Sequence, residues 1–248
     1  MTISVYPPMA SPDWYMAISR GQVPGATVQN IYGYQLAVST TTIPLWENAT
    51  AYTYPTGPTT MTLYSSSASD TAVSIIIVGL DNNYNRKTET LLLTNGTTGV
   101  TTANQYTRIN SIAVNGTNNP VGTIYLSDST KTVIYAQINL TGAQSDGRSQ
   151  MSIFTVPNGY TFYLTRVSAY ASPTNNASRY YNYRVWTRNI NTGIITILQQ
   201  APFVNTYSTT RVAPRPYPAK TDIQWQVGTS TDTGTVSVAV EGILIEGS

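Results

Sequence analysis

The chain has 248 residues, contains no histidine and no cysteine, and carries a charge on only 10% of its residues. Histidine is the usual proton shuttle near neutral pH and the commonest metal ligand, and cysteine supplies nucleophiles, soft metal ligands and disulfides. Their absence excludes the Ser-His-Asp triad, the Cys-His dyad and the common zinc sites. The net charge of +2 lacks the clustered Lys and Arg of nucleic-acid-binding proteins. We therefore expect a structural or binding protein that binds no nucleic acid.

Residues 1–50 combine several prolines and glycines with mixed aromatic residues, and we expect an extended N-terminal arm and irregular lead-in with one or two strands. Trp14, Tyr15 and Met16 form an apolar cluster that either packs on the chain's own core or docks on a neighbouring subunit. The first residues lack the basic and apolar regions of a signal peptide, so we expect no ordinary export. No apolar run approaches the roughly 20 residues that span a membrane, so we expect no membrane partner.

Residues 51–140 predict a first β domain of short strands separated by turn residues. Thr71 to Leu80 is apolar on both faces and predicts a central strand, followed by a turn and a partner strand at 88–94. Further strands are expected at 105–114, 121–127 and 131–139. The turn contains Asp81, Asn83 and Asn85, the spacing that opens an EF-hand calcium loop. Arg86 and Leu92 replace the glycine and glutamate of that loop, so we interpret the segment as a β-turn and predict no metal site.

Residues 141–148 are polar, contain two glycines and predict a linker. Residues 149–248 then predict a C-terminal β-sandwich with strands at 149–156, 160–171, 179–190, 194–200, 203–212, 221–228 and 234–246. Within 221–227, Ile223, Trp225 and Val227 share one face while Asp222, Gln224 and Gln226 share the other, which predicts a half-buried strand. The expected fold is all-β, with two sandwich domains of jelly-roll or immunoglobulin-like topology after the arm.

The acidic residues offer little evidence for catalysis. Paired carboxylates can hydrolyse glycosidic bonds, but no motif places two of them across a cleft. The residues considered are Asp70, Asp81, Glu89, Asp128, Asp146, Asp222, Asp232 and Glu241. The sequence also lacks the glycine loops that bind nucleotide phosphates, so we predict no catalytic residue and no cofactor.

Aromatic and arginine residues crowd the segment from 179 to 188. On a strand, Tyr181 and Tyr183 face one side while Arg184, Trp186 and Arg188 face the other, and Arg179 precedes them. Tyr, Trp and Arg are enriched at protein interfaces, and aromatic rings also stack on sugars. The segment therefore predicts a protein interface, a carbohydrate site, or simply one core face and one solvated face. Together with Trp14, Tyr15 and Met16, these are the candidate interface residues.

Several strings occur in an order that resembles virion structural proteins of tailed bacteriophages, especially podovirus-like phages of marine and other aquatic habitats. The resemblance covers most of the chain, and each string is weak alone. The strings are SRGQVPG (19–25), LWEN (45–48), YTYP (52–55), GLDNNYNRKTET (79–90), GTTGVTT (96–102), YTRI (106–109), VPNGY (156–160) and PAKTD (218–222).

The resemblance implies a particle component made in the host bacterial cytoplasm and located in the virion. We expect a capsid decoration (cement) protein that binds the major capsid protein and copies of itself, as a homotrimer or homodimer. The alternative is a tail, neck or receptor-binding module that recognises a host-surface glycan. An enzyme acting on polysaccharide is a third hypothesis. Low surface charge suits assembly in salty water, because salt screens exposed ion pairs.

Overall fold

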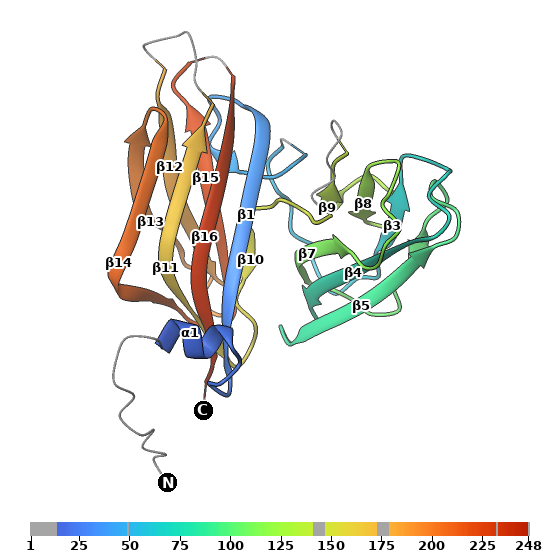
Figure 1. The fold of residues 1–248 in the computed structure, drawn as a ribbon, viewed down its shortest axis with the longest axis horizontal. Helices are drawn as coiled ribbons and strands as arrows, with labels where there is room; N and C mark the ends of the chain where they lie inside the picture. Colours follow the sequence, from blue (N-terminus) through green and yellow to red (C-terminus); the bar gives the residue numbers. More distant parts are fainter. Residues whose placement is uncertain (1–13, 49, 141–146, 173–178, 232, 248) are drawn as a thin grey trace.

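The computed structural model describes residues 14–48, 50–140, 147–172, 179–231 and 233–247. Within these ranges the protein is nearly all β, with one short helix, α1 (Trp14–Ser19), and several antiparallel sheets. The all-β prediction is therefore confirmed. Figure 1 shows the strands gathered into two bodies that lie beside each other. Nowhere in the described ranges does a helix have the length and apolar composition to cross a membrane.

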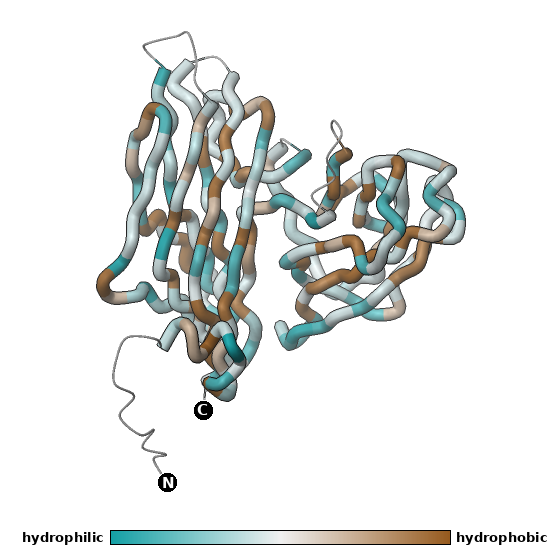
Figure 2. Tube along the Cα trace, in the orientation of Figure 1, coloured by the Kyte–Doolittle hydropathy of each residue, from teal (hydrophilic) through white to brown (hydrophobic). Residues whose placement is uncertain are grey.

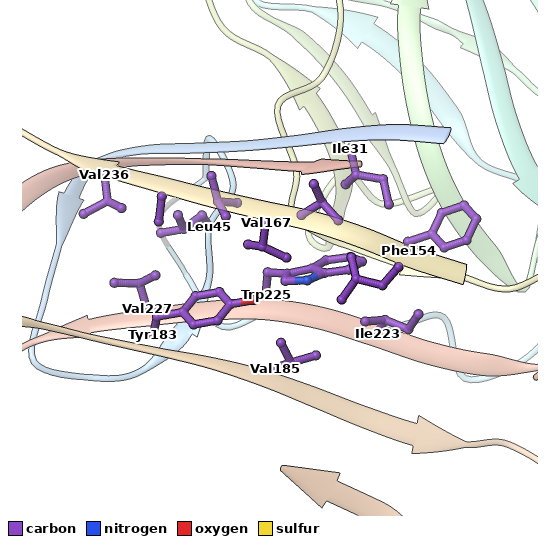
Figure 3. Close-up of a cluster of buried hydrophobic side chains, with 14 of the residues drawn as sticks. Ile31, Leu45, Phe154, Val167, Tyr183, Val185, Ile223, Trp225, Val227 and Val236 are labelled. Atoms are coloured by element: carbon purple, nitrogen blue, oxygen red, sulfur yellow. The ribbon is translucent and has the colours of Figure 1, made fainter. Parts of the chain in front are cut away.

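The larger body, here called the large sheet pair, consists of two facing sheets. The first sheet has the order β1 (Ala26–Val38), β16 (Gly234–Glu246), β11 (Tyr160–Ala171) and β14 (Thr206–Tyr217). The second has the order β10 (Ile153–Thr155), β15 (Thr221–Thr229), β12 (Tyr181–Asn189) and β13 (Ile195–Phe203), with β2 (Ile43–Pro44) also paired to β15. A hydrophobic core fills the space between the sheets, where Trp225 and Val227 of β15 lie close to Val167 of β11 (Figure 3).

The pairing in the large sheet pair is nested. The first strand pairs with the last, since β1 lies beside β16. Moving inward, β2 and β10 pair with β15, β11 pairs with β14, and β12 pairs with β13. Every one of these pairs is antiparallel, so the large sheet pair has the connectivity of one long hairpin folded over on itself.

The expectation of an N-terminal arm and irregular lead-in with one or two strands is met in part, because the described residues before position 50 include the strands β1 and β2. Residues 14–19 form a helix instead of an extended arm; Ala17 and Ile18 are buried, and Ile18 packs with Ala26 and Ile243. Residues 26–38 form the long strand β1 within the large sheet pair. The pairing of β1 with β16 joins segments about 200 positions apart, which no local sequence pattern reports. Residues 1–13 lie outside the described residues.

The smaller body, the small sheet pair, is formed by strands from the middle of the chain. One sheet has the order β6 (Val100–Thr101), β3 (Thr62–Ser65), β8 (Ile124–Ser127) and β9 (Ile134–Ile138). The other has the order β5 (Arg86–Leu93), β4 (Val73–Leu80) and β7 (Arg108–Val114), so the central position predicted for 71–80 is confirmed. The small sheet pair has its own hydrophobic core. Figure 2 shows hydrophobic and hydrophilic residues alternating along strands of both bodies, as expected for packed sheets.

The chain leaves and re-enters the large sheet pair at a single point. β2 and β10 lie end to end along the same side of β15, with Pro44 opposite Gln226 and Ile153 opposite Gln224. We call this point the neck between the two bodies. Here Leu45 and Ser152 are hydrogen-bonded to each other, and the Ser152 N–H donates to the Leu45 carbonyl at 2.8 Å. The whole segment between them therefore leaves from an interruption in one strand of the large sheet pair.

Two other local predictions can be compared with the structure. The turn prediction at 81–85 is confirmed, because the Asp81 carboxylate accepts the backbone N–H groups of Asn83 and Asn85 at 2.8 and 2.9 Å. The prediction of a half-buried strand at 221–227 is wrong, because all nine residues of β15 are buried. On the polar face of β15, Asp222 contacts Arg108 of the small sheet pair and Gln224 contacts Tyr54, and sequence alternation cannot reveal such contacts. The predicted linker lies mostly at 141–146, outside the described residues.

Candidate functional site

Strand β12 shows the alternation predicted for the aromatic and arginine segment. Tyr181 and Tyr183 point into the core of the large sheet pair and have no exposed surface. Their assignment as interface residues is therefore corrected, because a second molecule cannot reach a fully buried ring. Arg184, Trp186 and Arg188 occupy the opposite face and are half-buried. Arg179 precedes β12 and is also half-buried.

The outer face of β12 and β15 holds a chain of side-chain hydrogen bonds. The Arg184 guanidinium donates to the Gln226 side-chain oxygen at 2.6 Å. The Gln226 amide then donates to Gln224 at 2.6 Å, and the Gln224 amide donates to the Tyr54 hydroxyl at 3.2 Å. Because Tyr54 belongs to the segment that leads to the small sheet pair, this chain connects the two bodies.

Asp222 stands at the centre of a buried ion cluster at the end of this face. Arg108 of β7 donates to its two carboxylate oxygens at 2.8 and 3.2 Å. Arg188 of β12 donates to one of those oxygens at 2.6 and 3.1 Å, and the Thr155 hydroxyl donates to the other at 2.7 Å. The Asp222 side chain has no exposed surface, and that of Arg108 is 6% exposed. Three segments that are distant in sequence thus converge on one carboxylate.

Tyrosine rings enclose the two guanidinium groups of this cluster. The Arg108 guanidinium carbon lies 4.5 Å from the centre of the Tyr54 ring and 5.5 Å from that of Tyr84. The Arg188 guanidinium carbon lies 5.2 Å from the Tyr54 ring centre. Burial alone would lower the pKa of Arg108, but its hydrogen bond to Asp222 and the charge of Asp222 outweigh burial and raise the pKa. Burial raises the pKa of Tyr54 well above its ordinary value, so the ring stays neutral.

The chemistry of this cluster fits a structural role, which is to hold the two sheet pairs together, and we call the cluster a structural lock. Both oxygens of Asp222 accept charge-assisted hydrogen bonds, and no water-accessible atom of the carboxylate remains to move a proton. Asp70, the other buried carboxylate among the described residues, accepts the N–H groups of Val121 and Gly122 at 2.7 and 3.0 Å. The described residues include no group of three or more acidic side chains that could hold a metal ion.

Helix α1 places the three N-terminal candidate residues on the surface. Trp14, Tyr15 and Met16 are 48%, 47% and 43% exposed. The next two residues are buried, so α1 is anchored by one side while the other side presents its apolar residues outward. The geometry leaves all three candidate residues accessible to a partner, as an interface requires.

The free edge of β13 is a further apolar surface that the sequence analysis did not identify. β13 is the last strand of its sheet, and β14 is the last strand of the facing sheet. The large hydrophobic side chains exposed on these two strands and their flanking turns are Ile194, Ile195, Ile197, Val204 and Val212. The sequence from 194 to 205 contains no charged residue, which is the one local signal that could have pointed to this edge. That β13 is an edge strand follows only from the sheet order.

Comparisons with known proteins provide little further information. No family model matches the chain, and no curated protein matches it. Among solved structures, one match is titled "Crystal structure of PBSX exported protein XepA", with 12% sequence identity and a TM-score of 0.19. The match covers 87% of this chain and 86% of that one. A TM-score this low carries no inference about the fold or the function of this chain.

Proposed function

We propose that the protein is a structural component of a tailed-phage virion, acting as a capsid decoration protein that binds the major capsid protein and copies of itself. The observation that carries the proposal is the exposed apolar surface at α1 and at the β13–β14 edge. Large apolar residues gathered on the outside of a soluble domain mark sites of association. Charged residues, the usual protection of edge strands, are absent from β13. The sequence resemblance supplies the particle context.

The strand order supports this proposal at the level of architecture. Nested antiparallel pairs divided between two facing sheets are the connectivity of a jelly roll, a fold common in viral capsid and lectin domains. We infer that the large sheet pair is a jelly-roll domain, and that the small sheet pair is a separate β-sandwich domain inserted into its interrupted strand. An immunoglobulin-like sandwich would have a different strand order.

The composition of purified particles tests the proposed role. We expect quantitative mass spectrometry of virions to find the chain at a copy number comparable to that of the major capsid protein. A copy number comparable to that of tail or neck components would contradict the decoration role while keeping the protein in the virion. Absence of the chain from purified particles would refute both.

A variant of α1 tests the interface directly. Replacing Trp14, Tyr15 and Met16 together by serine should leave the fold intact, because these side chains lie outside the core. The variant should lose binding to heads that lack the protein, measured by co-sedimentation. The control is a serine at Val121, which is 70% exposed on the small sheet pair. Normal loading of the α1 variant would show that α1 does not contact the shell.

The second candidate function is that of a tail or receptor-binding module that recognises a host glycan. It is favoured by one observation, a cleft with two arginine side chains between the two sheet pairs. Signal on a glycan array, together with labelling of tails in electron micrographs, would support this function over the decoration role.

A further inference from the structure

A cleft between the two sheet pairs lies outside the Asp222 ion cluster. It has a volume of about 160 Å³ and lies beside strand β1, and Leu244 of β16 also lines it. Asn30 of β1 lines one wall, Arg86 and Ser111 of the small sheet pair line the other, and Arg148 comes from the returning chain. Met151 and Phe154 contribute apolar surface. The cleft is small beside the roughly 300–1,000 Å³ of drug-sized pockets, so it suits one small group.

Contacts on either side of the cleft fix its walls. The Asn158 N–H donates to the Tyr84 carbonyl at 2.8 Å, which ties the β4–β5 turn to the large sheet pair. Asn110 and Thr155 exchange two hydrogen bonds of 2.9 and 3.1 Å between β7 and β10. Because both sheet pairs are held by these bonds and by the Asp222 cluster, the cleft is formed before any ligand arrives.

The charge in the cleft has one sign. Arg86 and Arg148 both line it, and its lining includes no aspartate or glutamate. Across the described part of the chain, no carboxylate forms an ion pair with either arginine. The Arg148 guanidinium lies over the Tyr32 ring at 5.2 Å, and Arg86 is exposed. Arginine presents a planar set of donors that matches a carboxylate or a phosphate.

Neutral polar groups complete the lining. Asn30 and Ser111 can hydrogen-bond to hydroxyl groups, and β1 has only one partner strand, so backbone groups on its cleft side have no ladder partner. A ligand with one negative group and several hydroxyls would use the arginines, the polar side chains and the apolar surface together.

We propose that the cleft between β1 and the small sheet pair binds a single acidic sugar unit, with Arg86 and Arg148 holding its carboxylate or phosphate. This inference does not depend on the proposed place of the protein in a virion. It makes the ligand class of the second candidate function specific, an acidic saccharide, and it is independent of the decoration role.

Titration of the full chain with glucuronate, inorganic phosphate and glucose, followed by NMR or calorimetry, tests the proposal. We expect at least one anion to bind and glucose to bind much more weakly. Preference for glucuronate indicates a carboxylated sugar, and preference for phosphate indicates that the acidic group of the ligand is a phosphate. Equal binding of glucose and glucuronate, or no binding of either anion to the folded protein, would overturn the proposal.

Variants locate the binding. Arg86→Gln and Arg148→Gln should each weaken anion binding at least tenfold, and the double variant should abolish it. Each keeps the fold, because neither side chain is buried, and circular dichroism verifies this. The matched control is Arg20→Gln, which removes the same charge from an exposed arginine at the end of α1. Unchanged affinity in both cleft variants, or an equal loss in the control, would place the anion elsewhere and overturn the proposal.

Discussion

At the scale of single residues, Asp222 joins the two sheet pairs through ion pairs with Arg108 and Arg188. It has no exposed surface, and it balances one guanidinium from each sheet pair. Its partner Arg108, which is 6% exposed, could not remain buried without it, since an unpaired charge in a protein interior is strongly unfavourable. The same residue would be unremarkable on a solvated face, which is where the alternation of 221–227 had placed it.

Replacement of Asp222 by asparagine should therefore lower the free energy of unfolding by about 3–5 kcal/mol, the usual cost of breaking a buried ion pair. The matched control is Glu241→Gln, which breaks the pair with Arg166, both partners being about half exposed. The control should cost less than about 1 kcal/mol. Denaturant titration followed by tryptophan fluorescence measures both values. Similar losses in the two variants would show that the Asp222 cluster is not a lock.

Glu89 predicts a dependence of stability on acid. Burial raises its pKa, but hydrogen bonds from the Ala103 and Asn104 N–H groups, the Asn104 amide and Tyr106 outweigh burial and lower the pKa. A carboxyl whose pKa is lowered on folding stabilises the protein above its unfolded pKa, near 4.5, and loses that contribution as the pH falls through the folded value. The stability difference between the native protein and Glu89→Gln should therefore shrink below about pH 4.5. A difference that stays constant on acidification would contradict this.

At the scale of elements, the sequence predicted where strands begin and end better than it predicted which strands lie side by side. The bounds expected for 160–171 and 234–246 match β11 and β16, because alternating apolar residues between turn residues define a strand locally. The inward position of Tyr181 and Tyr183 followed from the same alternation. The burial of Asp222 and the edge position of β13 did not, because each depends on which distant segment lies alongside. The sequence indicated Arg188 of β12 as an interface residue, but it did not show that Arg188 would bind Asp222 within the chain or that Arg108 and Tyr54 would lie beside it.

Strand β13 supports a prediction about self-association. Ile195 and Ile197 are 58% and 43% exposed, and they lie opposite Arg188 and Trp186 of β12, so these four side chains share the outer face. Replacing Ile195 and Ile197 by lysine should lower the oligomeric mass measured by light scattering and leave the melting temperature nearly unchanged. Lysine at Val121 is the control and should change neither. An unaltered mass for the β13 variant would exclude this edge from the subunit contact.

At the scale of the whole molecule, the division into two sheet pairs was predicted only in part. The sequence analysis separated residues 51–140 from 149–248, but Met151 and Ile153 of the second segment lie in the core of the small sheet pair, and Ile31 and Leu45 lie in the core of the large sheet pair. It could not show that residues 26–38 belong with the second segment, because the partners in β16 are about 200 positions away. Local sequence patterns do not indicate which distant strands pair with each other. In the sequence, the strands of the small sheet pair come after β2 and before β10, and both β2 and β10 pair with β15.

The geometry of the neck predicts where the small sheet pair can be removed. Leu45 and Ser152 share the position opposite Trp225, where the Leu45 N–H donates to the Trp225 carbonyl and the Ser152 carbonyl accepts the Trp225 N–H. One residue at this position can supply both the N–H donor and the carbonyl acceptor. Deleting 46–152 joins Leu45 directly to Ile153, so that Leu45 fills the shared position and the strand becomes continuous. We expect this deletion to yield a soluble large sheet pair that unfolds cooperatively on heating.

Two deletions that differ from this one by a single residue serve as controls for the register of β2 and β10 on β15. Deleting 46–151 leaves two residues for one ladder position, which a β-bulge can accommodate at some loss of stability. Deleting 45–152 leaves none, which shifts β10 by one residue and turns Phe154 away from the core. The melting temperature of the 46–151 deletion should therefore be lower than that of the 46–152 deletion, and the 45–152 deletion should not fold. Equal stability of all three would mean that β2 and β10 do not form one interrupted strand, and the inference of an inserted domain would fail with it.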